Sequence, residues 1–257
     1  MLEVATQPSG VVLITLDHGK VNALDTDLLI ALIDAFARFD VEQPVVLTGA
    51  GSAFSAGVDL RHVADRNDRQ LMSFLRALSD CFLAVFDHRG PVIAAINGPA
   101  IAGGCVIAAA CDRRLISKGP IGLAELAVGA PFPTSAVEIM RLVLGPATED
   151  LVLTARLLDA QQAVAVGLAH EIVSADELVQ KALEQATTLR NLPTGVFAFT
   201  KRQLQAPARE RIATRSGDDD PRMNALWASQ PVREAITRYM SDLSSARAKS
   251  RRPDSPD

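Results

Sequence analysis

Two stretches of the chain share one pattern, which limits the possible folds more than any other feature. In each stretch a short apolar run leads into a turn of small residues, and a helical pattern follows. The stretches are VVLTGAGSAFSAGVDL at 45–60 and AAINGPAIAGGCVIAAACD at 94–112. Short apolar runs that alternate with helices are typical of βαβ units and a mostly parallel sheet. The pattern therefore predicts an α/β fold.

The remainder of the chain agrees with this fold class. Predicted strands alternate with amphipathic helices in the first half, and after Pro133 the pattern is helical almost throughout. The strands are expected at 2–6, 10–16, 44–48, 91–96 and 113–117, with a short one near 170–173, and the helices around 28–36 and over 69–88. The first two strands are separated by Pro8-Ser9-Gly10, which predicts a hairpin. Asp25 or Thr26 can cap the first helix.

The two small-residue turns are candidates for a binding site. Ala56-Gly57 forms one turn, and Gly103-Gly104 lies where a helix is expected to begin. The N-terminus of a helix carries unpaired N–H groups and partial positive charge. If the two turns converge, their backbone donors would form an oxyanion hole. Taken singly, each turn is better explained by glycines that only permit tight packing.

Composition excludes several classes of function. The chain has 257 residues, 26 Lys plus Arg against 30 Asp plus Glu, and 4% aromatic residues. A slight acidic excess with few aromatic rings disfavours a nucleic-acid partner. Three irregularly spaced cysteines without a CxxC pair predict neither a disulfide framework nor a metal site. No signal-peptide pattern and no apolar run of ~18 residues is visible, so a cytoplasmic protein without a membrane partner is expected.

Two familiar motifs do not fit the first turn. In a dinucleotide-binding G-x-G-x-x-G sequence, the third glycine would fall on Phe54, which would crowd a pyrophosphate. Ser55 lacks the G-x-S-x-G frame of a serine hydrolase, and the four histidines form no motif with it. Neither a nicotinamide or flavin enzyme nor a serine hydrolase is expected.

Several segments, in order and spacing, resemble the crotonase (enoyl-CoA hydratase/isomerase) superfamily. They are Asn22-Ala23-Leu24, VLTGAGSAFSAGVDL at 46–60, NGPAIAGGCVIAAACD at 97–112, GLAELAVG at 122–129 and LTARLLDAQQAVAVGLAHEIV at 153–173. The resemblance implies a crotonase spiral of ββα units with a C-terminal helical trimerisation region. It divides the chain into an acyl-CoA-binding core at 1–192, helices at 193–243 and a polar tail at 244–257.

The resemblance also implies roles for individual residues. In this family two backbone N–H groups bind the thioester carbonyl of an acyl-CoA, and by position they would be those of Ala56 and Gly103. The residues implied to bind the rest of the substrate are Asn22, Ala23, Leu24, Gly57, Val58, Asp59, Leu60 and Gly104. Coenzyme A would enter only as part of the substrate, with no metal or redox cofactor. A homotrimer or a dimer of trimers is implied.

One departure from the family pattern decides the expected reaction. A hydratase of this family carries one glutamate after the glycine turn and another in a GLPE-type segment. Here Val106 occupies the first position, and Glu125 in Gly122-Leu123-Ala124-Glu125 supplies the second. A single carboxylate can move a proton from C2 to C4 of a 3-enoyl-CoA, which makes the 2-enoyl-CoA. An isomerase with Glu125 as its acid-base group is therefore expected.

Two alternatives stay open at this stage. An enoyl-CoA hydratase would need a second carboxylate, for which Glu138 is the first candidate, whereas Asp59 is expected to order its own turn. The Asp218-Asp219-Asp220 run could reach the site only through a suitable loop. The loss of the glutamate at Val106 also fits a scaffold that binds acyl-CoA without turnover. The depth of the pocket is expected to depend on 62–90 and 130–145.

Overall fold

The computed structural model describes residues 1–64 and 66–250. Within these residues the main sheet has six strands in the order β1-β2-β3-β4-β6-β9. Its strands are β1 (Leu2–Thr6), β2 (Val12–Leu16), β3 (Val45–Gly49), β4 (Val92–Ile96), β6 (Arg113–Ile116) and β9 (Glu171–Ile172). β1 and β2 pair antiparallel as the expected hairpin, and every later pair is parallel. The predicted α/β architecture is confirmed.

Helices cover both faces of this sheet. On one face lie α1 (Thr26–Arg38), α3 (Asp68–Phe86) and α4 (Gly103–Ala110), and on the other lies α9 (Leu178–Arg190). Successive side chains of a strand point to opposite faces, so Val45 and Leu47 join the larger core while Val46 packs in the core that contains α9. Burial on both faces explains why these strands read as continuous apolar runs.

A second, smaller sheet positions the two turns. It consists of β5 (Ala100–Ile101), β7 (Ile121–Gly122) and β8 (Leu157–Leu158). Ser55 pairs with Ala100 in a parallel bridge, and Ala100 N–H donates to Pro120 O at 3.0 Å. The first turn, the start of α4 and the segment that leads to Glu125 are thus held side by side.

The other helices surround this framework. They are α2 (Leu60–Ala64), α5 (Glu125–Val128), α6 (Thr134–Leu144), α7 (Ala147–Thr154), α8 (Ala160–Ala165), α10 (Val196–Ala228) and α11 (Gln230–Ser250). The N-cap of α1 is Asp25, whose side chain accepts a hydrogen bond from Leu28 N–H. The expected capping by Asp25 or Thr26 is thus resolved in favour of Asp25.

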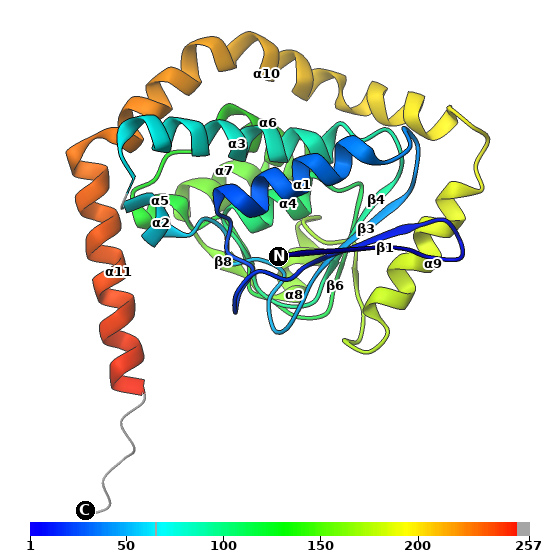
Figure 1. Cartoon of the computed structure of the whole chain (residues 1–257), viewed down its shortest axis with the longest axis horizontal. Coiled ribbons are helices and arrows are strands. Elements are labelled where there is room, and N and C mark those ends of the chain that lie inside the picture. The colour runs from blue at the N-terminus through cyan, green and yellow to red at the C-terminus, as the bar shows by residue number, and fades with distance from the viewer. Residues whose placement is uncertain (65, 251–257) are drawn as a thin grey trace, which may run out of the picture.

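The last two helices form an outer layer around the core (Figure 1). α10 runs across α6 and α3, and α11 then turns down past α2 and α5. α11 continues to Ser250, past the boundary at 243 that the sequence predicts for the helical region. The rest of the predicted tail, 251–257, lies outside the described residues.

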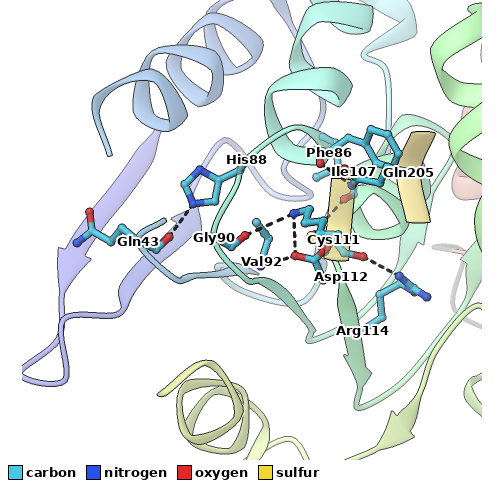
Figure 2. A network of polar contacts seen from close by, with 11 residues as sticks. Gln43, Phe86, His88, Gly90, Val92, Ile107, Cys111, Asp112, Arg114 and Gln205 are labelled. Atoms are coloured by element: carbon cyan, nitrogen blue, oxygen red, sulfur yellow. Dashed lines mark hydrogen bonds and ion pairs between the residues drawn. The ribbon is translucent and has the colours of Figure 1, made fainter. Parts of the chain in front are cut away.

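Buried polar contacts fasten α10 to the core. Lys201 Nζ donates to Asp112 Oδ2 at 2.8 Å, and the same oxygen accepts Val92 N–H at 2.8 Å. Gln205 Nε2 donates to Phe86 O at 2.7 Å. Figure 2 shows Gln205 beside Phe86, the last residue of α3, and Asp112, which follows the end of α4. These contacts hold the first part of α10 against the core.

Candidate active site

A cavity of about 920 Å³ opens beside the two small-residue turns. Its walls come from the first turn, the start of α4, the Glu125 segment and both C-terminal helices. The residues that the sequence assigns to the site and that line this cavity are Ala23, Ala56, Val58, Asp59, Leu60, Gly103 and Glu125. The structure therefore brings together segments that are far apart in the sequence.

The hydrogen bonds of the first turn do not leave the expected backbone donor free. Ala56 N–H donates to Val21 O at 2.9 Å, so it is already occupied, contrary to the expectation for Ala56. Leu24 N–H donates to Gly57 O, and Asp59 N–H donates to Leu24 O. In such a parallel bridge the N–H and C=O of the paired residue, Val58, point away from Leu24. The geometry therefore turns the Val58 N–H away from the strand-like pairing, and Val58 itself lines the cavity.

The second turn presents the N-terminus of α4. Gly103 is the first residue of this helix, after Ala102 with φ of 54°. A Cβ atom on Gly57 would lie 3.2 Å from Gly103 N and 2.5 Å from Ile101 O. The two turns are thus in direct contact, and glycine at 57 is required both by this approach and by its φ of 79°.

Four of the expected substrate-binding residues lie behind the cavity wall rather than in it. Asn22 is 1% exposed, and its Nδ2 donates to Ala53 O at 2.9 Å, while Ser55 Oγ donates to Asn22 O at 2.7 Å. Leu24 is fully buried, and Gly57 and Gly104 pack against neighbouring backbone. In the structure Asn22, Leu24, Gly57 and Gly104 hold the two turns in place.

Glu125 is the carboxylate with a free oxygen in the cavity. It begins α5, and its Oε2 is buried without a hydrogen-bond partner among the described residues. Burial raises the pKa of this carboxyl to about 8, although the backbone N–H groups of Glu125 and Ala124 partly oppose the shift. A carboxylate with such a pKa can both remove and return a proton near neutral pH.

The other candidate carboxylates have structural partners. Glu138 is 1% exposed as a residue, but it forms ion pairs with Arg141 and Arg211 and does not line the cavity. Asp59 Oδ1 accepts Arg61 N–H at 3.1 Å, so it orders its own turn as expected. Asp218–Asp220 lie in a helix rather than a loop, and Asp220 caps α6 by accepting the N–H and hydroxyl of Thr134.

Val106, at the position where a hydratase of the family carries its first glutamate, has no group that could transfer a proton. Its side chain is fully buried in the core cluster and does not line the cavity. Among the described residues that line the cavity, Asp59 and Glu125 are the only carboxylates. Asp59 Oδ1 accepts a hydrogen bond within its own turn, whereas Glu125 Oε2 has no hydrogen-bond partner in the described part of the chain.

The cavity lining contains both charged and apolar side chains. His18, Lys20 and Arg61 belong to the lining, and His18 Nε2 lies 2.6 Å from Asp25 Oδ2. Other lining residues are apolar or aromatic, namely Leu78, Phe82, Val128, Ala130, Pro131, Pro133, Ala136, Trp227, Tyr239, Met240 and Leu243. The contribution of 62–90 and 130–145 is confirmed. The contribution of 227–243 was missed, because no local pattern shows that α11 folds back onto the first turn.

Neither a metal site nor a membrane span is found in the described part of the chain. No cluster of three or more His, Cys, Asp or Glu residues suited to a metal ion occurs there. No helix in residues 1–64 and 66–250 is long and apolar enough to cross a bilayer. The three cysteines, Cys81, Cys105 and Cys111, are free and buried.

Comparisons with known proteins agree with this architecture. The family model described as enoyl-CoA hydratase/isomerase matches residues 6–245. The crystal structure of human mitochondrial delta3-delta2-enoyl-CoA isomerase superposes with a TM-score of 0.89 at 22% identity, covering 95% of this chain and 98% of that one. At this identity the likeness speaks for the fold alone, and it confirms the crotonase fold expected from the sequence.

Relatives by sequence carry both hydratase and isomerase names. A putative enoyl-CoA hydratase of Thermus thermophilus is 34% identical over 74% of this chain and 78% of that protein. Human mitochondrial enoyl-CoA delta isomerase 1 is 23% identical over 91% of this chain and 80% of that protein. The fold and the paired turns define a crotonase-type protein. The chain belongs to the enoyl-CoA hydratase/isomerase family.

Proposed function

We propose that this protein converts 3-enoyl-CoA thioesters into 2-enoyl-CoA thioesters, with Glu125 as its single acid-base group. The observation that carries the proposal is the free, buried Oε2 of Glu125 in a cavity whose other carboxylate, Asp59, is held by its own turn. An isomerisation needs one group that moves one proton twice, and Glu125 has the environment for that task.

In the first step the Glu125 carboxylate removes a proton from C2 of the substrate. The electron pair of the broken C–H bond moves toward the thioester and gives a dienolate with negative charge on its oxygen. The carboxyl now carries the proton, which its raised pKa favours.

In the second step the same carboxyl returns the proton to C4. The C3–C4 double bond electrons form the new C–H bond, and the enolate electrons restore the carbonyl and close the C2–C3 double bond. No atom is gained or lost, and the Glu125 carboxylate is regenerated. The reaction as proposed requires no metal and no redox cofactor.

The dienolate oxygen is stabilised by two backbone donors. We assign them to the N–H groups of Val58 and Gly103, since the Ala56 N–H is bonded to Val21 O and the turns of Val58 and Gly103 are in contact. Fixed donors aimed at the developing charge stabilise the transition state more than the ground state, and each contributes ~10² to 10³ in rate.

We assign the coenzyme A part of the substrate to the cationic residues of the cavity lining. Lys20 and Arg61 offer cationic groups that complement the phosphates of coenzyme A, and Ala23 and Leu60 line the same cavity. The acyl group is assigned to the apolar residues of the lining, past Gly103 and Glu125. This orientation places the thioester carbonyl between the two turns.

Hydration of 2-enoyl-CoA is the second candidate, because the 34% identical relative is named a putative enoyl-CoA hydratase. Hydration by the two-glutamate route needs a second proton-transfer group beside the β-carbon. Val106 cannot supply it, and Glu138 is held by Arg141 and Arg211. These contacts favour isomerisation.

Self-association belongs to the proposal as well. The resemblance implies a homotrimer or a dimer of trimers, and α10 exposes several large apolar side chains that such contacts would cover, namely Val196, Phe199, Leu204 and Leu226. A cytoplasmic location stays a prediction of the sequence.

The proposed role of Glu125 is tested by comparing it with Glu138. We expect Glu125→Gln to lower kcat for a trans-3-enoyl-CoA by ~10² to 10⁴ while leaving the affinity for a saturated acyl-CoA nearly unchanged. Glu138→Gln is the matched control. It removes a charge from an ion-pair network outside the cavity, so it should lower stability and retain most turnover.

The outcome also separates the alternatives. Full activity of Glu125→Gln would contradict the assignment of the base. Binding of acyl-CoA by the unaltered protein without turnover of any enoyl-CoA would instead indicate a scaffold.

A further inference from the structure

Trp227 lines two cavities of unequal size. It lines the main cavity of about 920 Å³ together with Pro131 and Ala136. It also lines a small cavity of about 30 Å³ together with Val63 and Leu71. The indole is 3% exposed and belongs to the main core cluster. The indole is thus common to the linings of both cavities.

The indole is held in one orientation. Its Nε1 donates to Pro131 O at 3.0 Å, and Pro131 lies in the segment that joins α5 to α6. A buried indole N–H needs such a partner, so rotation of the ring would leave a polar group unsatisfied. The wall is therefore rigid and does not move aside for a longer ligand without losing this bond.

The small cavity is suited to an apolar group. Val63, Leu71 and Ile236 are at most 3% exposed and form much of its lining. Its two main polar neighbours already have partners. Arg233 donates to Arg66 O at 3.1 Å and to Asp68 Oδ1 at 2.8 Å, and Thr237 Oγ1 donates to Arg233 O at 2.9 Å.

We infer that the indole of Trp227 sets the longest acyl tail that the main cavity accommodates, by closing it off from the small apolar cavity behind. The inference rests on the proposed acyl-CoA substrate and adds a specificity-determining residue to it. A tail that reaches the indole must stop or bend, whereas removal of the indole would join the two spaces lined by Ala136 and Leu71.

The unaltered protein already contains a probe for this inference, since Trp227 is the single tryptophan of the chain. Its fluorescence, excited where adenine does not absorb, is titrated with free coenzyme A and with butanoyl-, octanoyl- and dodecanoyl-CoA. Binding is measured in parallel by calorimetry. We expect the emission to be unchanged by free coenzyme A and to change once the tail is long enough to reach the indole. Emission that stays the same while long-chain acyl-CoA binds would overturn the inference.

Substitutions give the second arm. Trp227→Ala should improve the affinity for dodecanoyl-CoA relative to butanoyl-CoA by about tenfold, because added methylenes then find apolar space. Trp227→Leu removes less of the packing and should give a smaller shift in the same direction, which keeps the test valid if Trp227→Ala does not fold. An unchanged preference in the folded variant would contradict the inference.

A double substitution makes the test specific to the shared wall. Leu71→Ala enlarges only the small cavity, so alone it should leave the tail preference unchanged. Combined with Trp227→Ala, it should extend the preference further. Equal effects of Leu71→Ala in both backgrounds would contradict a partition by Trp227. Failure of every acyl-CoA to bind would overturn the proposed function together with this inference, whereas binding without turnover would overturn the isomerase alone.

Discussion

At the scale of single residues, Glu125 and Glu138 have opposite environments. Glu138 is neutralised by two arginines, while Glu125 Oε2 has no partner in the described part of the chain. A buried carboxylate without a cation destabilises the folded protein, and such groups are concentrated at functional sites. The contrast explains why burial alone does not identify the residue that we propose as the acid-base group.

The raised pKa of Glu125 predicts a pH dependence of activity. The base must be ionised, so kcat/KM for a 3-enoyl-CoA should rise with pH and level off above about 8, the pKa of this carboxyl. This rise of kcat/KM with pH should be absent from the residual activity of Glu125→Gln. A profile that is flat between pH 6 and pH 9 would contradict the assignment, and initial rates across that range provide the measurement.

The same pKa predicts a pH dependence of stability with a defined sign. The pKa of about 8 in the folded state lies above the ordinary value of 4.5, so the folded state holds its proton over a pH range where the unfolded state has lost it. Stability is therefore lost as pH rises from 4.5 to about 8, by ~1.4 kcal/mol per pH unit from this group. Glu125→Gln should lack this loss in urea denaturation and become the more stable form at alkaline pH.

Sequence patterns located the first turn but not the hydrogen bonds of its backbone N–H groups. The small residues at 55–58 are visible in the sequence, whereas the pairing of Leu24 with Val58 joins segments more than a helix apart. This pairing decides which N–H groups are used. The expected donor, Ala56, was wrong because its N–H is bonded to Val21 O. Glu125, in contrast, could be found from a local motif.

At the scale of elements, the site depends on the close approach of two turns. Gly57→Ala would place a Cβ 2.5 Å from Ile101 O and push the turns apart, so we expect kcat to fall by ~10² or more through loss of the oxyanion hole. Gly51→Ala is the control, because Gly51 also has positive φ but no atom within 4 Å of its added Cβ. Both variants should lose ~1–2 kcal/mol from the strained φ, and only Gly57→Ala should lose turnover. Equal kcat values in the two variants would contradict the account.

The attachment of α10 predicts a second effect at this scale. Lys201 and Asp112 form an ion pair in which the side chains are 7% and 17% exposed. Lys201→Ala leaves a buried carboxylate and should lower the free energy of unfolding by ~3 kcal/mol. Arg156→Ala breaks an exposed pair with Asp150 and should change it by less than about 1 kcal/mol. Urea denaturation of both variants checks this, and equal losses would mean that burial of the Lys201 pair has no special weight.

The helices and strands differ in how well the sequence pattern predicts them. Long apolar or amphipathic runs predicted β3, β4, α1 and α3 well, because their periodicity reflects burial. The two-residue strands β5, β7 and β8 are too short to carry a period. α10 continues through Pro207 and Pro221, residues that normally end a helix, so tertiary contacts rather than local preference maintain it.

At the scale of the whole molecule, segments from the beginning and from the end of the sequence together line the cavity. Ala23 and Asp59 come from the first quarter of the sequence, and Trp227 and Tyr239 come from the last helices. Figure 1 shows how α10 carries the chain across the core so that α11 returns to the side of α2 and α5. The fold class could be predicted from the N-terminal half, whereas this closure depends on long-range packing. For this reason the apolar residues that the last helices contribute to the cavity could not be predicted from the sequence.

The most direct test of the central claim is the mass of the product from each of two substrates. Purified protein is incubated separately with a trans-3-enoyl-CoA and a trans-2-enoyl-CoA, and the products are separated by liquid chromatography and weighed by mass spectrometry. With Glu125 as the single acid-base group, the first substrate should give a 2-enoyl-CoA of equal mass, and the second should take up no water. A product of the second substrate that is heavier by one water would contradict the claim and require a second proton-transfer group in the cavity.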